Sequence, residues 1–270
     1  MDHTAVRVET CSLTMVRRIA AMLDQDVDVW ADGDLLPRGW HFILLGADTR
    51  RSLIREDGFP GLGIALPDLG LPRLVLGGRT VRCHDDIRIG STLRRESRID
   101  KVTEKQTANG RMAIVNVSHV LSDPNTTRPV LEESQTYLML SAPYAASAAA
   151  GPGDIAPPPA ATKVVPDATL LFHYSALGFN SHRVHLDREF AHDAEGLPDL
   201  VVNGGLALLL LTEFLRTQLG GTFSVLAVRH MAPLFSGRPM LLSGEARGSS
   251  WVLRAWDDAG RLAVEVDATV

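Results

Sequence analysis

The densest group of polar side chains in the sequence lies in the segment HYSALGFNSHRVHLD, residues 173–187. Its members that can exchange a proton, or hold a water or an anion, are Asn180, His182, Arg183, His185 and Asp187. Histidine titrates near neutral pH, so this segment has the side chains for acid–base chemistry on water. A single histidine before a helix is more often a packing or capping residue, with Asp187 as the N-cap. Two histidines, an amide and an arginine within six residues favour a site.

A glycine pair, Gly204-Gly205, follows Asn203 about twenty residues later and precedes the apolar run Leu206–Leu215. That run is apolar almost all round, which predicts a buried helix. Glycine at a helix start lets another group approach the backbone, where the first-turn N–H groups are unpaired. Together with the helix dipole, these groups stabilise an anion or a developing oxyanion. Close packing of the helix on a sheet would require the same glycines, so both interpretations stay open from the sequence.

The composition of the chain excludes several classes of protein. The chain has 270 residues, of which 45% are apolar and 22% charged, which excludes a disordered chain and allows one large domain or two modest ones. The formal net charge is −5, so no basic field favours DNA or RNA as a partner.

Cysteine usage and hydropathy bear on the expected cofactors and on the expected cellular location. Cys11 and Cys83 make neither a disulfide framework nor a four-ligand zinc cluster, and no metal or other cofactor is expected. The longest apolar stretch, near Leu206–Leu211, is far shorter than the roughly 20 residues that a membrane span needs. The N-terminus does not resemble a signal peptide, so we expect a cytoplasmic protein with no membrane association.

One break in composition divides the chain. In residues 145–160, AASAAAGPGDIAPPPA, 13 of 16 residues are Ala, Pro or Gly, which is typical of a linker. We therefore predict an N-terminal domain at 1–142, a linker at 143–164 and a C-terminal domain at 165–270. The two domains are of comparable size, as a duplicated fold would require.

Periodicity predicts the elements of each half. Residues 113–121 and 135–140, with a turn at Asn109-Gly110, and residues 251–256 and 262–270 alternate as strands do, while Leu13–Leu23 and 188–194 have helical spacing. These patterns predict an α+β fold with antiparallel sheet around a main helix. Gly58–Pro72 holds four Gly and three Pro, so no helix forms there. It is either an ordinary surface loop or the replacement of a helix that leaves space for a ligand.

Several motifs together resemble a known group of enzymes. The more specific ones are Ser175-Ala176-Leu177, Phe179-Asn180, His182, Val184-His185, Asp187, Glu195-Gly196-Leu197-Pro198 and the following Val-Asn-Gly. Looser ones are Pro37, Trp40-His41, Leu76-Gly77-Gly78-Arg79, and Arg229 with Pro233-Leu234-Phe235. The chain thus resembles the double-hot-dog, MaoC-like acyl-CoA hydratases and type 2 hydroxyacyl-thioester dehydratases, in particular the itaconyl-CoA and mesaconyl-CoA hydratases.

The resemblance implies two hot-dog units, each an antiparallel sheet wrapped around a central helix, with the N-terminal helix reduced or replaced by loop. It implies a substrate-accommodating N-terminal unit, a catalytic C-terminal unit and a homodimer. The implied activity is a hydro-lyase that adds water to a short α,β-unsaturated dicarboxylyl-CoA, with itaconyl-CoA to citramalyl-CoA as the first candidate. Alternatives are a mesaconyl-CoA hydratase, a general 3-hydroxyacyl-thioester dehydratase, a hot-dog acyl-CoA thioesterase and a non-catalytic acyl-CoA-binding protein.

The resemblance also suggests roles for single residues. The broader group has the pattern Asp-x-Asn-Pro-x-His-x-Asp, in which Asn180 takes the place of the first Asp and cannot exchange a proton at neutral pH. His185 is therefore the principal acid–base, Asn180 holds a water, and Gly204 and Gly205 supply the oxyanion site. Candidates for binding the substrate or CoA are Arg183, His182, Arg79, Asn203 and Arg38. Structural ion pairs remain an equal alternative for the arginines.

Overall fold

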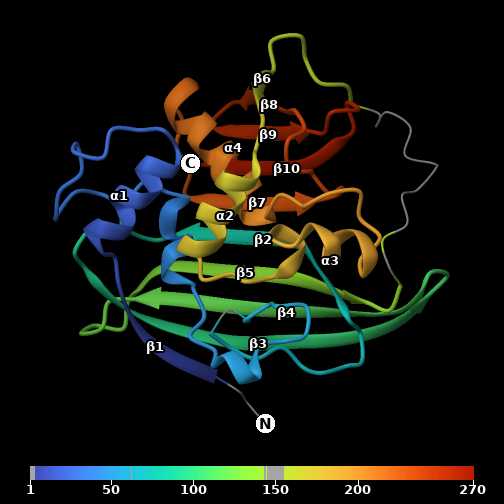
Figure 1. Ribbon diagram of the computed structural model, residues 1–270. Coiled ribbons are helices and arrows are strands. Elements are labelled where there is room, and N and C mark those ends of the chain that lie inside the picture. The colour runs from blue at the N-terminus through green and yellow to red at the C-terminus, as the bar shows by residue number, and fades with distance from the viewer. Residues whose placement is uncertain (1–3, 62, 143, 145–154) are drawn as a thin grey trace.

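The computed structural model describes residues 4–61, 63–142, 144 and 155–270, and its main feature is one ten-stranded antiparallel sheet (Figure 1). Across the sheet the strands follow the order β1-β3-β4-β5-β2-β7-β10-β9-β8-β6. Their bounds are β1 (Thr4–Thr10), β2 (Arg73–Cys83), β3 (Thr92–Thr107), β4 (Gly110–Ser122), β5 (Pro129–Leu140), β6 (Thr162–Val164), β7 (Val225–His230), β8 (Met240–Arg247), β9 (Ser250–Trp256) and β10 (Leu262–Thr269). The helices are α1 (Leu13–Met22), α2 (Ala168–Leu177), α3 (Arg188–Asp193) and α4 (Gly204–Gln218), with 3₁₀ turns η1 (Trp40–Leu44), η2 (Arg51–Leu53) and η3 (Arg183–His185).

Each half of the chain supplies five of these strands. Strands β1 to β5 form one end of the sheet and β6 to β10 the other, and the halves join where β2 pairs with β7, from Gly78 opposite Arg229 to Arg82 opposite Val225. Of the predicted linker, residues 143 and 145–154 lie outside the described residues. Its last residues, Thr162–Val164, pair with β8 as the final strand of the sheet.

The predicted hairpins are present, because the alternation of apolar residues gives each strand a buried face. The predicted stretches 113–121, 135–140 and 251–256 lie within β4, β5 and β9, and 262–270 corresponds to β10. Val115, Val117 and Met139 are fully buried, whereas Asp267 and Thr269 face solvent. The turn between β3 and β4 places Gly110 at φ +106°, a backbone conformation that glycine adopts without strain.

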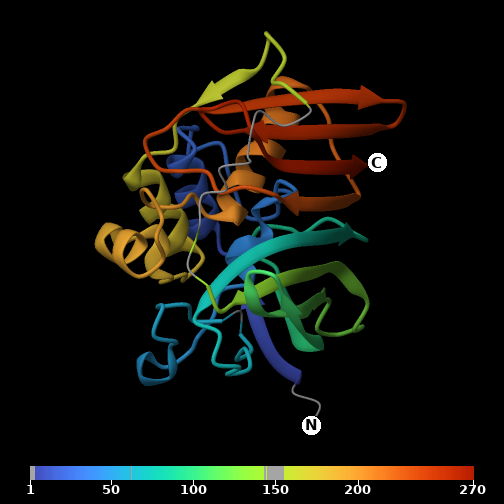
Figure 2. The same ribbon diagram turned by 90° about the vertical axis from the view of Figure 1, so that its right-hand side faces the viewer.

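The C-terminal half is built around α4. Its residues from Leu206 to Leu215 are buried apart from Leu210, as the apolar run predicted. Figure 2 shows α4 between the strands on one side and α1, α2 and α3 on the other. Even its polar Glu213 is buried, because it accepts hydrogen bonds from the Trp40 indole at 2.7 Å and from Arg216.

Among the described residues of the N-terminal half, no such helix lies against the strands. The short turns η1 and η2 and the loop residues 54–61 and 63–72 lie there instead, and Phe59 and Leu71 pack on β4 and β5. Helix α1, which matches the predicted Leu13–Leu23, packs on α2. The predicted α+β class and the loss of the N-terminal helix are thereby confirmed. Among the described residues, none of the helices is both long and apolar enough to span a membrane.

Candidate active site

A cavity of about 450 Å³ lies where the two halves meet. Its walls come from η1, the loop residue Phe59, strands β2 and β5, helix α2, the segment around η3, the first turn of α4 and the end of β7. Seven of the predicted site residues line it: Arg79, Asn180, His182, His185, Asn203, Gly204 and Gly205. The loop that replaces a helix in the N-terminal half thus contributes Phe59 to the wall of this cavity.

His185 is held in the orientation that a general base needs. Its Nδ1 lies 2.8 Å from the carbonyl oxygen of Val201, and since a carbonyl only accepts, Nδ1 carries the proton and donates it. This leaves the Nε2 lone pair free for a molecule in the cavity. Burial, together with the neighbouring His182, lowers the pKa of His185 to about 3. The imidazole is therefore neutral at pH 7, and its Nε2 carries a lone pair that can accept a proton.

Asn180 and His182 stand beside this base on one short turn. The Asn180 Oδ1 accepts from the backbone N–H of His182 at 3.0 Å, so its Nδ2 group remains for a water. The rings of His182 and His185 meet edge to face, with 5.3 Å between their centroids. Burial and the nearby Arg55 lower the pKa of His182 to about 3, so it too is neutral.

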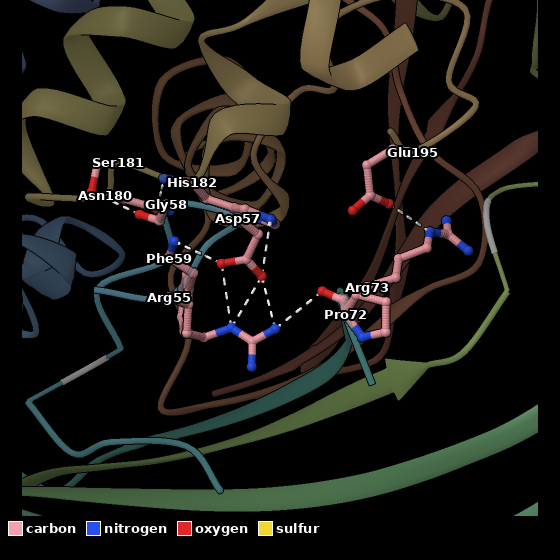
Figure 3. A network of polar contacts seen from close by, with 10 residues as sticks. All are labelled: Arg55, Asp57, Gly58, Phe59, Pro72, Arg73, Asn180, Ser181, His182 and Glu195. Atoms are coloured by element: carbon pink, nitrogen blue, oxygen red, sulfur yellow. Dashed lines mark hydrogen bonds and ion pairs between the residues drawn. The ribbon is translucent and has the colours of Figure 1, made fainter. Parts of the chain in front are cut away.

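A loop from the other half fixes this turn from below (Figure 3). Arg55 holds the buried Asp57 carboxylate at 2.9 Å, and the Asp57 carbonyl accepts from the backbone N–H of Arg183. Gly58 accepts from the Ser181 hydroxyl at 2.7 Å. The buried Nε2 of His182 lies 3.9 Å from the Asp57 carboxylate. The N-terminal half therefore positions the histidines of the C-terminal half.

The first turn of α4 is crowded from two sides. A Cβ on Gly204 would lie 3.1 Å from the His230 ring and 3.2 Å from Leu76. A Cβ on Gly205 would lie 2.1 Å from the Tyr174 hydroxyl oxygen and 3.5 Å from Nη2 of Arg79. Both glycines also line the cavity. They therefore allow close packing of neighbouring side chains and also leave the N-terminus of α4 accessible to a ligand.

Arg79 brings a positive charge to the same place. Its Nε lies 3.2 Å from Oε1 of the buried Glu133, whose Oε2 accepts from His41 at 2.7 Å. Burial alone would raise the pKa of Glu133, but Arg79 and the hydrogen bond from His41 bring it down to about 2, so the carboxylate is charged. The ion pair fixes the Nε side of Arg79 and leaves its Nη side towards α4.

The model of the hydroxyacyl-thioester dehydratase type 2 family matches residues 39–236. The chain belongs to this family. It is therefore a hydro-lyase, as the sequence motifs predicted. The chain is 35% identical over 239 residues to the mesaconyl-C(4)-CoA hydratase of Chloroflexus aurantiacus, covering 87% of this chain and 83% of that one. It is 29% identical over 96 residues to the mitochondrial type 2 dehydratase of Schizosaccharomyces pombe, covering 34% of this chain and 32% of that one.

Solved structures show the fold of this hydro-lyase. A MaoC-like dehydratase of Phytophthora capsici superposes with a TM-score of 0.72 at 14% identity, covering 100% of this chain and 95% of that one. A Mycobacterium tuberculosis protein described as a double hot dog superposes with a TM-score of 0.62 at 13% identity, covering 99% and 94%. The predicted double hot-dog fold is confirmed.

Two arginines predicted to bind substrate in this hydro-lyase do not line the cavity. Arg183 pairs with Asp187 at 2.7 Å, and its guanidinium lies 4.1 Å from the centroid of the Phe190 ring. Arg38 pairs with Asp86 at 2.9 Å. Both arginines thus take part in ion pairs outside the cavity, and their assignment to the substrate or to CoA stays a prediction. Asp187 also caps α3, as the alternative interpretation of that segment expected.

Other cavity residues of the dehydratase were not predicted. They include Tyr174, His230, and the ion pair of Arg73 with Glu195, whose atoms lie 3.0 Å apart (Figure 3). Tyr174 lies on α2, a helix that the sequence pattern did not reveal. His230 ends a strand far from the histidine cluster, and burial, with Arg79 nearby, lowers its pKa to about 3. In the part of the chain that the structure describes, no group of three His, Cys, Asp or Glu side chains is arranged to hold a metal.

Proposed function

We propose that this enzyme adds water to the double bond of a short α,β-unsaturated dicarboxylyl-CoA. The observation that carries the proposal is a neutral His185, with Nδ1 bound to Val201, in one cavity with the glycine-rich start of α4 and the Arg79 guanidinium. The relative from Chloroflexus aurantiacus supports a CoA thioester as the substrate class. Itaconyl-CoA and mesaconyl-C(4)-CoA are the two candidates.

In the proposed mechanism the thioester oxygen lies at the N-terminus of α4. His185 takes a proton through Nε2 from a water that the Asn180 Nδ2 group holds, and the water oxygen bonds to the β-carbon. The π electrons move towards the thioester oxygen, where the backbone N–H groups of Gly204 and Gly205 stabilise the negative charge by a few kcal/mol. The imidazolium of His185 then returns its proton to the α-carbon, and the neutral base is restored.

Arg79 is the proposed contact for the second carboxylate of the acyl group. Its guanidinium lines the cavity beside Gly205, so a carboxylate on a four- or five-carbon acyl chain can meet it while the thioester rests on α4. Arginine binds carboxylates through two parallel N–H bonds, which gives both affinity and orientation.

A panel assay on the purified protein tests this proposal. Itaconyl-CoA, mesaconyl-C(4)-CoA, crotonyl-CoA and a saturated acyl-CoA are incubated separately, with mass spectrometry for water addition and a thiol reagent for free CoA. The proposal expects one added water on a dicarboxylyl-CoA and no thiol. Water addition to crotonyl-CoA alone would reject the dicarboxylate specificity. Thiol release without hydration would make the protein a thioesterase, and binding without either change would make it a binding protein.

The state of His185 predicts an unusual pH dependence. Because its pKa is lowered to about 3, the neutral base persists as the pH falls, and kcat/KM is expected to stay constant from about pH 8 to about pH 5. A histidine with an ordinary pKa near 6.5 would instead lose activity through this range. Initial rates with crotonyl-CoA, whose acyl chain does not titrate, measure the profile. A decline centred near pH 6.5 would contradict the assigned state of His185.

A further inference from the structure

The hydroxyl of Tyr174 lies directly on the first turn of α4. Its oxygen is 2.1 Å from the position that a Cβ on Gly205 would occupy, and the ring carbon that bears it is 3.1 Å from that position. Only glycine fits beneath this hydroxyl. The glycine at position 205 therefore allows the Tyr174 phenol to lie against the N-terminus of α4, where the thioester oxygen of the proposed substrate lies.

The hydroxyl is available to a molecule in the cavity. The Tyr174 ring lines the cavity, and its hydroxyl makes no hydrogen bond to any other residue that the structure describes. A hydroxyl at a protein surface exchanges partners with water, but this side chain is only 6% exposed. Burial raises the pKa of Tyr174 above its ordinary value, so the phenol keeps its proton throughout the working range of pH.

Packing holds the phenol in place. The Tyr174 ring stacks on Phe42 with 4.5 Å between centroids and an interplanar angle of 22°. The next residue, Ser175, accepts from the Asn203 side chain at 3.2 Å, which ties α2 to the residue before α4. A donor whose position is fixed before the reaction costs little reorganisation when charge develops.

We propose that Tyr174 donates a hydrogen bond from its hydroxyl to the thioester carbonyl oxygen, next to the N–H groups of the first turn of α4. This inference rests on the proposed function, and it makes Tyr174 a catalytic residue of the same reaction. The phenol stays protonated, so it stabilises the enolate oxygen without entering the proton transfers of His185. Tyr174 thus contacts the thioester, which all the candidate substrates share, whereas Arg79 contacts the second carboxylate of the acyl chain.

The variant Tyr174→Phe tests this division, because it removes the hydroxyl and keeps the stacked ring. We expect kcat to fall about 10²-fold, the typical effect of losing one oxyanion donor, and to fall equally with crotonyl-CoA and with the dicarboxylyl-CoA. KM is expected to change less than about threefold, since the bond strengthens only as charge develops. The matched control is Phe172→Leu, which changes an exposed aromatic residue of the same helix that does not line the cavity. Its kcat is expected to equal that of the unaltered enzyme.

A spectroscopic probe separates hydrogen bonding from a structural effect. Hexa-2,4-dienoyl-CoA absorbs at longer wavelength when its thioester carbonyl is polarised, so binding to the unaltered protein is expected to shift its absorbance to the red. Tyr174→Phe is expected to reduce this shift and Phe172→Leu to preserve it. An undiminished shift in Tyr174→Phe, or no shift with the unaltered protein, would overturn the inference.

The probe also distinguishes a failure of the proposed function from a failure of the proposed Tyr174 hydrogen bond. A protein that fails to hydrate any enoyl-CoA, yet shows a red shift that Tyr174→Phe reduces, would reject the proposed function and retain the hydrogen bond. Hydration with a kcat that Tyr174→Phe leaves unchanged would retain the function and reject the bond.

Discussion

Replacing His185 with glutamine is expected to lower kcat about 10³-fold for every enoyl-CoA substrate, the scale of a lost general base. Glutamine has a similar reach to histidine but cannot take a proton near neutral pH. The Nδ1 bond to Val201 leaves Nε2 as the ring's proton acceptor, and neither Asn180 nor Asn203 in the same cavity can replace it. The fall in absorbance of the conjugated thioester measures the rate.

The control for this change is His192→Gln. His192 lies on α3 with 73% of its side chain exposed and pairs with Asp193. Its loss is expected to leave kcat unchanged, and circular dichroism should show both variants folded. If His185→Gln kept its rate to within about tenfold of the unaltered enzyme, another group would be the base. His182 and His230, the other neutral histidines of the cavity, would then be the next candidates.

Replacing Arg79 with lysine is expected to discriminate between substrates. Lysine keeps the positive charge that Glu133 requires but loses the planar pair of donors that a carboxylate binds. KM for the dicarboxylyl-CoA is expected to rise about 10- to 100-fold, equivalent to a charged hydrogen bond of about 1.5–3 kcal/mol. KM for crotonyl-CoA is expected to change less than about threefold. Steady-state kinetics with both substrates measure the difference.

A second arginine on the same strand provides the comparison. Arg82 is exposed at the end of β2, three residues from Arg79, and does not line the cavity. Arg82→Lys is expected to leave both KM values unchanged. Equal increases in KM for crotonyl-CoA and the dicarboxylyl-CoA in Arg79→Lys would show that Arg79 supports the cavity through Glu133 and His41 rather than by binding the acyl carboxylate.

Local patterns carried most of what could be predicted. The apolar run of α4 and the hairpin alternation in β9 and β10 each depend on neighbouring residues, and the structure confirms them. The site segment from Asn180 to His185 is equally local, and Asn180, His182 and His185 reach the cavity together because they lie within six residues at the start of one 3₁₀ turn. The domain boundaries, the homodimer and the cytoplasmic location stay predictions.

Contacts between distant parts of the chain could not be predicted from the sequence. Arg79, Arg183 and Arg38 are alike as arginines in a sequence, yet only Arg79 reaches the cavity, because β2 runs along its wall. Its partner Glu133 lies on β5, and the pairing depends on the register in which Gln135 faces Arg79. Tyr174 was missed because α2 has apolar residues on its exposed as well as its buried face, so its spacing shows no buried side, and because the hydroxyl meets Gly205 only in the folded protein.

A crystal structure of His185→Gln with mesaconyl-C(4)-CoA or itaconyl-CoA bound tests the proposed mechanism most directly, since the variant is expected to convert its substrate about 10³-fold more slowly. We predict that the thioester oxygen lies about 3 Å from the Gly205 nitrogen and from the Tyr174 hydroxyl. We also predict the double bond beside residue 185 and the second carboxylate against Arg79. A thioester bound away from the start of α4, with its double bond out of reach of residue 185, would contradict this mechanism.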